Sequence, residues 1–135
     1  MKKNIFTHII AIALVAMSIM AIATTALADY RPWQYRWNAH TILPGTYPAD
    51  GTTLNTQIRN LQEDINTFRS NVAVFHTTGS GYYFAALTVD GKYGNASANA
   101  VKMIQKYFGL TQDGKCGVNT KNALWNALGY NPPAT

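Results

Sequence analysis

The sequence is poor in cysteine, in charged residues and in long apolar runs. Its 135 residues include one cysteine and six acidic residues, and only 13% of the residues are charged. One thiol cannot form an internal disulfide, so the fold has to be stabilised by packing, helix caps and turns. This requirement favours a compact helical bundle, and the sequence therefore predicts an all-α fold.

The long apolar run lies near the start of the chain. Residues 9–22 follow Lys2 and Lys3 and lead to Ala26-Leu27-Ala28, a pattern typical of a secretory signal peptide and its cleavage site. The run is shorter than the roughly 20 residues that a membrane-spanning helix needs. We therefore predict a signal peptide over residues 1–28, followed by export and release without a stable membrane anchor.

Basic residues exceed acidic ones but are not clustered. After the predicted signal peptide, nine lysines and arginines are spread between Arg31 and Lys121. Proteins that bind nucleic acids normally gather basic residues on one face, so nucleic acid is not an expected partner. A mild positive excess is better suited to an anionic surface such as a cell wall.

Residues 29–51 are rich in proline and aromatic residues and are predicted to form an extended arm. Proline disfavours helices and central strands, and this segment contains three prolines. Two interpretations of its rings are open. They pack on the domain that follows, or Trp33 and Trp37 form a surface that stacks on sugar rings. Packing is favoured, because most aromatic rings are buried.

Residues 52–130 are predicted to form the domain, and its clearest helix is residues 52–69. Apolar residues recur there at spacings of three and four, from Leu54 to Phe68. Glu63 and Asp64 lie off this stripe and are predicted to be its solvated side. Thr52 or Thr53 can cap the start of the helix.

Two further helices are expected, at about residues 96–108 and 119–128. Asn95 or Ser97 is expected to cap the first of them, and Gly109 to end it. Residues 70–87 are expected to form a partly buried loop. The sequence thus predicts a small three-helix bundle.

Two short segments of the chain repeat one another. Residues 87–94 read LTVDGKYG, and residues 110–117 read LTQDGKCG. We call them the first and the second repeat. Each contains an Asp-Gly turn and a second glycine and precedes a predicted helix, so together they mark a duplicated supersecondary unit. Glycine supplies positive φ and aspartate accepts backbone N–H bonds, so six residues are expected to shape these loops: Asp90, Gly91, Gly94, Asp113, Gly114 and Gly117.

The duplicated unit resembles the peptidoglycan-binding domain found on many bacterial cell-wall hydrolases. That family's motif reads D-G-x-[FY]-G-x-x-T-x-x-A-V-x-x-[FY]-Q, then L-x-x-D-G-x-x-G-x-x-T-x-x-A-L, and residues 87–128 keep its spacing. Residues 52–68 are similar to the family's first helix, with Leu61-Gln62 at its Leu-Gln pair. Ser97 replaces the usual threonine, Ile104 replaces an aromatic residue, and the link over residues 70–81 is longer than usual. The resemblance implies a protein of the cell wall that binds peptidoglycan.

Peptidoglycan offers sugar rings, amide groups and carboxylates to a binding protein. Aromatic, amide and lysine side chains bind such groups. The candidate ligand-binding residues on and around the two repeats are Lys92, Tyr93, Asn95, Gln105, Tyr107, Gln112 and Lys115. Tyr93 and Tyr107 are as well suited to the core as to a ligand.

The sequence offers little for catalysis or for metal binding. Asp90 and Asp113 could act as a catalytic pair, but a carboxylate that accepts backbone N–H bonds is a poor proton donor, so a structural role is favoured. His40, His76 and Cys116 lack the spacings of zinc sites, and the repeats lack the calcium-loop pattern. We expect Cys116 to be a small buried hydrophobic residue. The prediction is a non-catalytic protein without a cofactor or a metal.

Two functions remain open from the sequence. The first is an exported, non-catalytic module that binds peptidoglycan. The second is a protein that recruits or inhibits a cell-wall hydrolase, with residues 70–81 and the arm as its contact surfaces.

Overall fold

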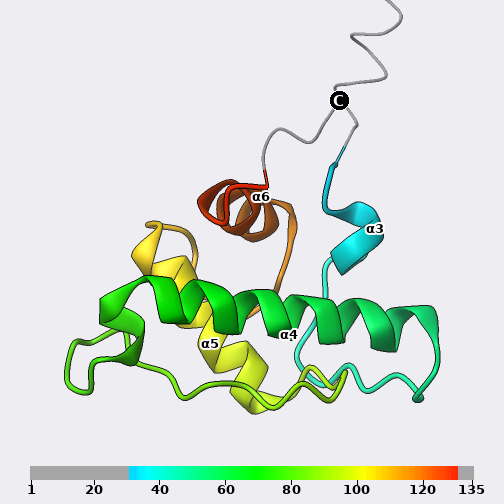
Figure 1. Cartoon of the computed structure of the whole chain (residues 1–135). Coiled ribbons are helices and arrows are strands. Elements are labelled where there is room, and N and C mark those ends of the chain that lie inside the picture. Colours follow the sequence, from blue (N-terminus) through cyan, green and yellow to red (C-terminus); the bar gives the residue numbers. More distant parts are fainter. Residues whose placement is uncertain (1–30, 131–135) are drawn as a thin grey trace, which may run out of the picture. The chain divides into compact units, whose positions relative to one another are not determined.

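The computed structural model describes residues 31–130, and the predicted signal peptide lies outside this range. Residues 32–130 belong to one compact unit. Its elements within the described residues are α3 (Gln34–Trp37), α4 (Thr53–Asn71), the 3-10 helix η1 (Ala73–His76), α5 (Asn95–Tyr107) and α6 (Val118–Ala127). Figure 1 shows α4 as the long green helix, with α5 in yellow crossing it. These residues are mostly helical and contain no named strand, so the all-α prediction is confirmed.

Residues 31–130 differ from the predicted three-helix bundle in containing a fourth α-helix, α3. The sequence predicted an extended arm here because of its prolines. The three prolines lie before or after Gln34–Trp37, so they do not interrupt this single helical turn. No helix within residues 31–130 combines the length and the apolar character that a membrane-spanning helix requires.

Helix α4 follows from its apolar stripe and from its cap. The Thr52 side chain accepts a hydrogen bond from the Asn55 N–H at 3.2 Å and so satisfies one of the free donors at the start of the helix. Ile58, Leu61 and Ile65 on the stripe are completely buried. The predicted bounds agree with those of the structure to within two residues.

The start of α5 differs from the prediction. No side chain caps it, and Gly94 occupies the cap position. Ser97 instead lies inside the first turn, where it is buried. The end of α5 is as predicted, because Gly109 has φ of +71° and the Leu110 N–H donates to the Gln105 carbonyl at 2.8 Å.

The two tryptophans of the arm belong to the core. Trp33 and Trp37 are both 0% exposed, which confirms that these rings pack on the domain. The Trp33 Nε1–H donates to Asn122 Oδ1 on α6 at 2.7 Å, and Lys121 Nζ lies 4.8 Å from the centroid of the Trp33 ring. The arm is therefore packed against α6 as well as α4.

Asp64 was predicted to be solvated, and this prediction is wrong. Its carboxylate is buried and accepts hydrogen bonds from Arg36 Nε at 2.6 Å, from Trp37 Nε1 at 2.7 Å and from the Tyr130 hydroxyl at 2.9 Å. The side of α4 that lies off the apolar stripe is covered there by α3 and by Tyr130. Glu63 is exposed, as predicted.

The remainder of the arm runs along both repeats. Ile42 pairs with Cys116 and Thr46 pairs with Tyr93 in two isolated antiparallel bridges. Backbone hydrogen bonds of 2.9 Å join the Cys116 N–H to the Ile42 carbonyl and the Tyr93 N–H to the Thr46 carbonyl. One extended segment therefore fixes the two repeats side by side.

Residues 70–87 form a partly buried connection that contains η1. Phe75 is buried between Phe68 and Phe84, with ring centroids 5.2 and 5.4 Å away. His76 is exposed. The Tyr107 ring packs against the Phe75 ring at 5.1 Å, but 44% of the Tyr107 side chain remains exposed.

Cys116 is completely buried, as the sequence predicted, and should be unreactive in the folded protein. Desolvation by burial raises the pKa of the thiol from 9.0 to about 12, although the charge of Lys121 acts to lower this pKa. At pH 8 the thiolate fraction should thus be about 1,000-fold lower than that of an ordinary cysteine. We expect almost no reaction with dithionitrobenzoate in buffer and complete reaction in guanidinium chloride. A fast reaction in buffer would contradict this burial.

Candidate functional site

A buried glutamine holds the first repeat in place. Gln62 of α4 accepts hydrogen bonds at its Oε1 from the Asp90 N–H at 3.0 Å and the Gly91 N–H at 2.9 Å. Its Nε2 group donates to Asp90 Oδ1, to the Lys92 carbonyl and to Ser97 Oγ at 3.0–3.2 Å. One amide thus joins α4 to the turn and to the first turn of α5.

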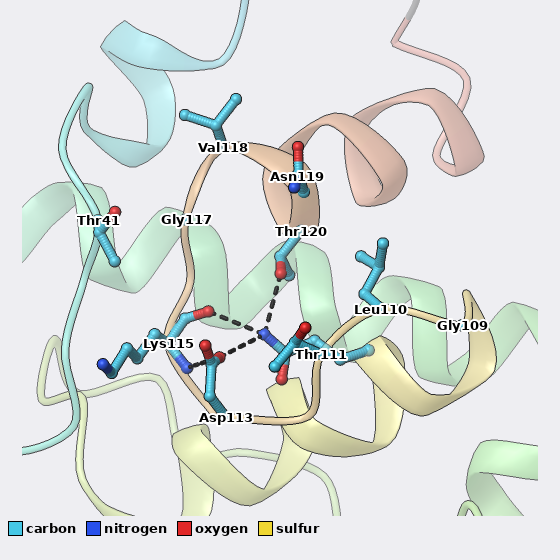
Figure 2. A pocket seen from close by; sticks show the side chains of 11 residues that line it. Thr41, Gly109, Leu110, Thr111, Asp113, Lys115, Gly117, Val118, Asn119 and Thr120 are labelled. Carbon is cyan, nitrogen blue, oxygen red and sulfur yellow. Dashed lines mark hydrogen bonds between the residues drawn. The ribbon is translucent and has the colours of Figure 1, made fainter.

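The second repeat has the same arrangement, with Gln105 of α5 in place of Gln62. The Gln105 Nε2 group donates to Asp113 Oδ1, the Lys115 carbonyl and Thr120 Oγ1 at 2.9–3.0 Å, and Figure 2 labels these three acceptor residues. The Gly114 N–H donates to Gln105 Oε1 at 3.0 Å. The sequence repeat is therefore also a repeat of hydrogen bonds.

Both aspartates close their own turn. Asp90 Oδ1 accepts the Lys92 N–H, and Asp113 Oδ1 accepts the Lys115 N–H, each at 2.9 Å. Partial desolvation acts to raise the pKa of Asp90, but hydrogen bonds from the Lys92 N–H and Gln62 lower it below its usual value. The Lys115 N–H, together with Gln105, lowers the pKa of Asp113. Both carboxylates are therefore ionised at neutral pH.

Stability should fall in acid because of these two carboxylates. Their pKa values are lower in the folded state, so the stabilisation exists above the ordinary value of 3.8 and disappears as the pH falls through the folded-state values. Between about pH 5 and pH 2, the urea midpoint of the double variant Asp90→Asn/Asp113→Asn should fall less than that of the native protein. An equal fall in both proteins would contradict the assignment.

The first glycine of each repeat is required by backbone conformation. Gly91 has φ of +76° and Gly114 has φ of +73°, a region that other residues rarely adopt. At Gly91 there is also no space, because an added Cβ would lie 2.2 Å from Asn55 Nδ2.

The second glycine of each repeat leaves room for the arm. Gly94 and Gly117 have negative φ, but a Cβ there would lie 3.1 Å from the Tyr47 hydroxyl and 3.2 Å from Thr41 Oγ1, respectively. Figure 2 shows Thr41 on the arm beside Gly117. The arm thus approaches both repeats at equivalent points.

A pocket adjoins each repeat. The pocket beside the first repeat, which we call the loop-1 pocket, has a volume of about 430 Å³. The pocket beside the second repeat, the loop-2 pocket, has a volume of about 550 Å³. Nine lining positions of the loop-1 pocket recur 23 residues later in the loop-2 pocket, and Gln62 and Gln105 line the two pockets at corresponding places. The recurring positions in the loop-1 pocket are Ala86, Leu87, Thr88, Asp90, Lys92, Gly94, Asn95, Ala96 and Ser97. Those in the loop-2 pocket are Gly109, Leu110, Thr111, Asp113, Lys115, Gly117, Val118, Asn119 and Thr120.

Three predicted ligand-binding residues line these pockets with exposed side chains. Lys92 and Asn95 line the loop-1 pocket, and Lys115 lines the loop-2 pocket. Gln112 is exposed but lines neither pocket, and Tyr107 belongs to the aromatic cluster around Phe75.

Tyr93 and Gln105 lie in the interior rather than at the surface where we expected a ligand to contact them. Tyr93 is 0% exposed, its hydroxyl donates to the Gly114 carbonyl at 2.7 Å, and burial raises its pKa. It joins the two repeats. Gln105 is also buried, and its amide is occupied by the hydrogen bonds of the second repeat.

Several lining residues were not among the predicted ligand-binding residues. Thr88 and Thr111 recur 23 residues apart, as the lysines do, so the repeat itself could have identified them. Nothing in the local sequence identifies Tyr47 and Thr41, since backbone pairing with the distant repeats brings the arm to the pockets. Within residues 31–130, no three His, Cys, Asp or Glu side chains are grouped closely enough to hold a metal ion.

Comparison with known proteins agrees with the resemblance seen in the sequence. Residues 78–124 match the profile of a family described as a putative peptidoglycan binding domain. No curated protein and no solved structure matches the chain significantly. The matched segment contains both repeats, α5 and most of α6, but neither the arm nor α4. Residues 78–124 of this chain are therefore similar to the peptidoglycan-binding domain family.

Proposed function

We propose that this chain is an exported, non-catalytic module that binds peptidoglycan of the cell wall. The observation that carries the proposal is that the segment matching the family supplies most of the lining of both pockets. The lysine and threonine side chains that the two repeats contribute to the pockets are exposed to solvent, so a ligand can reach them. Export rests on the predicted signal peptide over residues 1–28, and N-terminal sequencing of secreted protein should begin at Asp29.

The chemistry of the pockets supports a role in binding. Each pocket has a lysine ammonium that can meet a carboxylate of a stem peptide, and a threonine hydroxyl that can bond an amide or a sugar hydroxyl. Tyr47 adds an exposed aromatic ring at the loop-1 pocket. Such a mixture of apolar surface with a few polar groups is typical of ligand sites.

The chemistry of the aspartates supports a non-catalytic role. Glycoside hydrolysis requires one carboxylic acid whose pKa is raised, so that it can donate a proton near neutral pH. Hydrogen bonds lower the pKa of both Asp90 and Asp113. We therefore expect no decrease in the turbidity of a cell-wall suspension when the pure protein is added, and a steady decrease would overturn this part of the proposal.

Cosedimentation with purified cell-wall sacculi tests the binding proposal. The purified protein should pellet with the sacculi at low salt, and protein left wholly in the supernatant would refute the proposal. Lys92→Met and Lys115→Met should each weaken binding about threefold, as expected for an exposed charged contact. Lys102→Met is the matched control, because Lys102 is exposed on α5 but lines neither pocket.

A second candidate function is the recruitment or inhibition of a cell-wall hydrolase. The observation that favours it is a group of half-exposed tyrosines beside the long connection. Tyr83 and Tyr107 are 41% and 44% exposed, and the Arg69 guanidinium lies 5.7 Å from the Tyr83 ring centroid. Tyrosine and arginine are enriched at protein interfaces. If this function is correct, affinity capture with the native protein should recover a protein partner in stoichiometric amount. The double variant Tyr83→Ser/Tyr107→Ser should fail to recover that partner.

A further inference from the structure

The two pockets share their chemistry but no residues. The lysine and the aspartate at the edge of the loop-1 pocket recur in the loop-2 pocket, and no residue lines both. Two ligands bound there would therefore not compete for one side chain. A single composite site would instead require residues of both repeats to line the same pocket.

Each pocket presents one positive and one negative group. Lys92 and Lys115 are exposed, and the two aspartates are ionised. The hydrogen bonds that hold Asp90 and Asp113 end on Oδ1 of each carboxylate. A ligand that carries both an ammonium and a carboxylate would find an opposite charge for each. Uncrosslinked stem peptides of peptidoglycan have such ends when they contain a diamino acid.

The arm makes the pockets similar in shape but different in detail. Tyr47 adjoins Gly94 in the loop-1 pocket, and Thr41 adjoins Gly117 in the loop-2 pocket. Ala96 in the first also corresponds to Asn119 in the second. The charged pair is thus conserved between the pockets, whereas the neighbouring surface is more apolar in the first.

We propose that the domain is bivalent, with one pocket in each repeat that binds the zwitterionic end of a stem peptide. This inference rests on the proposed function and deepens it. Because peptidoglycan is a polymer with many such ends, two weak pockets on one rigid domain would bind it much more tightly than either pocket alone. The duplication that holds the fold together would then also double the site.

Calorimetric titration with a soluble, uncrosslinked disaccharide-peptide tests the proposal. The native protein should bind two molecules. Ala96→Trp fills the loop-1 pocket and Asn119→Trp fills the loop-2 pocket, and each variant should bind one molecule with unchanged affinity. Both positions are exposed in the first turn of a helix, so each variant is the matched control for the other. The double variant should bind none.

A native stoichiometry of one, or loss of all binding in either single variant, would overturn bivalency. Lys92→Glu and Lys115→Glu reverse the charge without adding bulk, and each should also reduce the number of bound disaccharide-peptides from two to one. These variants test the proposal even if a tryptophan variant does not fold. In cosedimentation with sacculi, each single variant should bind at least tenfold more weakly than the native protein. If the protein binds sacculi but not the disaccharide-peptide, the bivalency proposal is refuted and the proposed function is not. Failure to bind sacculi would refute the proposed function itself.

Discussion

Replacing Gln62 with leucine should lower the free energy of unfolding by about 3 kcal/mol or more. Leucine fills a similar volume but leaves the N–H groups of Asp90 and Gly91 and the carbonyl of Lys92 without the amide that they contact. Each buried polar group left without a partner costs about 1–3 kcal/mol. Since small domains are stable by about 5–15 kcal/mol in total, this is a large fraction of the stability.

The duplication gives this prediction an internal test. Gln105→Leu should also cost about 2 kcal/mol or more, because it removes the corresponding contacts with the Gly114 N–H, the Lys115 carbonyl and Thr120 Oγ1. Gln112→Leu is the control, since Gln112 is exposed, and its effect should stay within about 0.5 kcal/mol. Urea unfolding followed by tryptophan fluorescence measures all three. A cost below about 1 kcal/mol for both buried glutamines would show that they do not hold the repeats.

Asp64→Asn should destabilise the domain by about 2–3 kcal/mol. Asp64 Oδ2 accepts from Arg36 and Trp37, and Oδ1 accepts from Arg36 and Tyr130. An asparagine of the same shape would direct its NH₂ group at one of these pairs of donors. Breaking a buried ion pair costs about 3–5 kcal/mol, and the value here is smaller because the Arg36 side chain is 37% exposed.

Glu63→Gln is the control for Asp64→Asn. It makes the same change of charge on the neighbouring residue, which is exposed, and should alter the free energy of unfolding by less than about 0.5 kcal/mol. If the two variants were equally stable, the carboxylate of Asp64 would not be holding α3 and Tyr130 against α4.

Hydrophobic spacing and glycine positions in the sequence were enough to predict α4 and the end of α5. The stripe from Leu54 to Phe68 predicts α4, and Gly109 predicts the end of α5. Helix α3 has four residues and no periodicity, so its presence depends on distant contacts such as that from Trp33 to Asn122. The burial of Asp64 depends on contacts of the same kind, which no spacing along α4 reveals.

The successful predictions of the candidate site lie in the first and second repeats and at Asn95, which directly follows the first repeat. Lys92 and Lys115 recur in the two repeats and line the two pockets. Tyr93 is adjacent to Lys92 but points into the core, because its backbone pairs with Thr46 and its hydroxyl reaches Gly114. The contribution of the arm could not be predicted, since a bridge between segments about 50–70 residues apart leaves no periodic trace.

Amide chemical-shift mapping of the protein with a soluble disaccharide-peptide tests most directly the claim that the repeats bind peptidoglycan. Saturable shifts should appear among residues 84–97 and 109–120, which supply most of the lining of the two pockets, and the amides of residues 73–82 should not move. The absence of saturable shifts, or shifts confined to the surface around Tyr83 and Tyr107, would contradict the account.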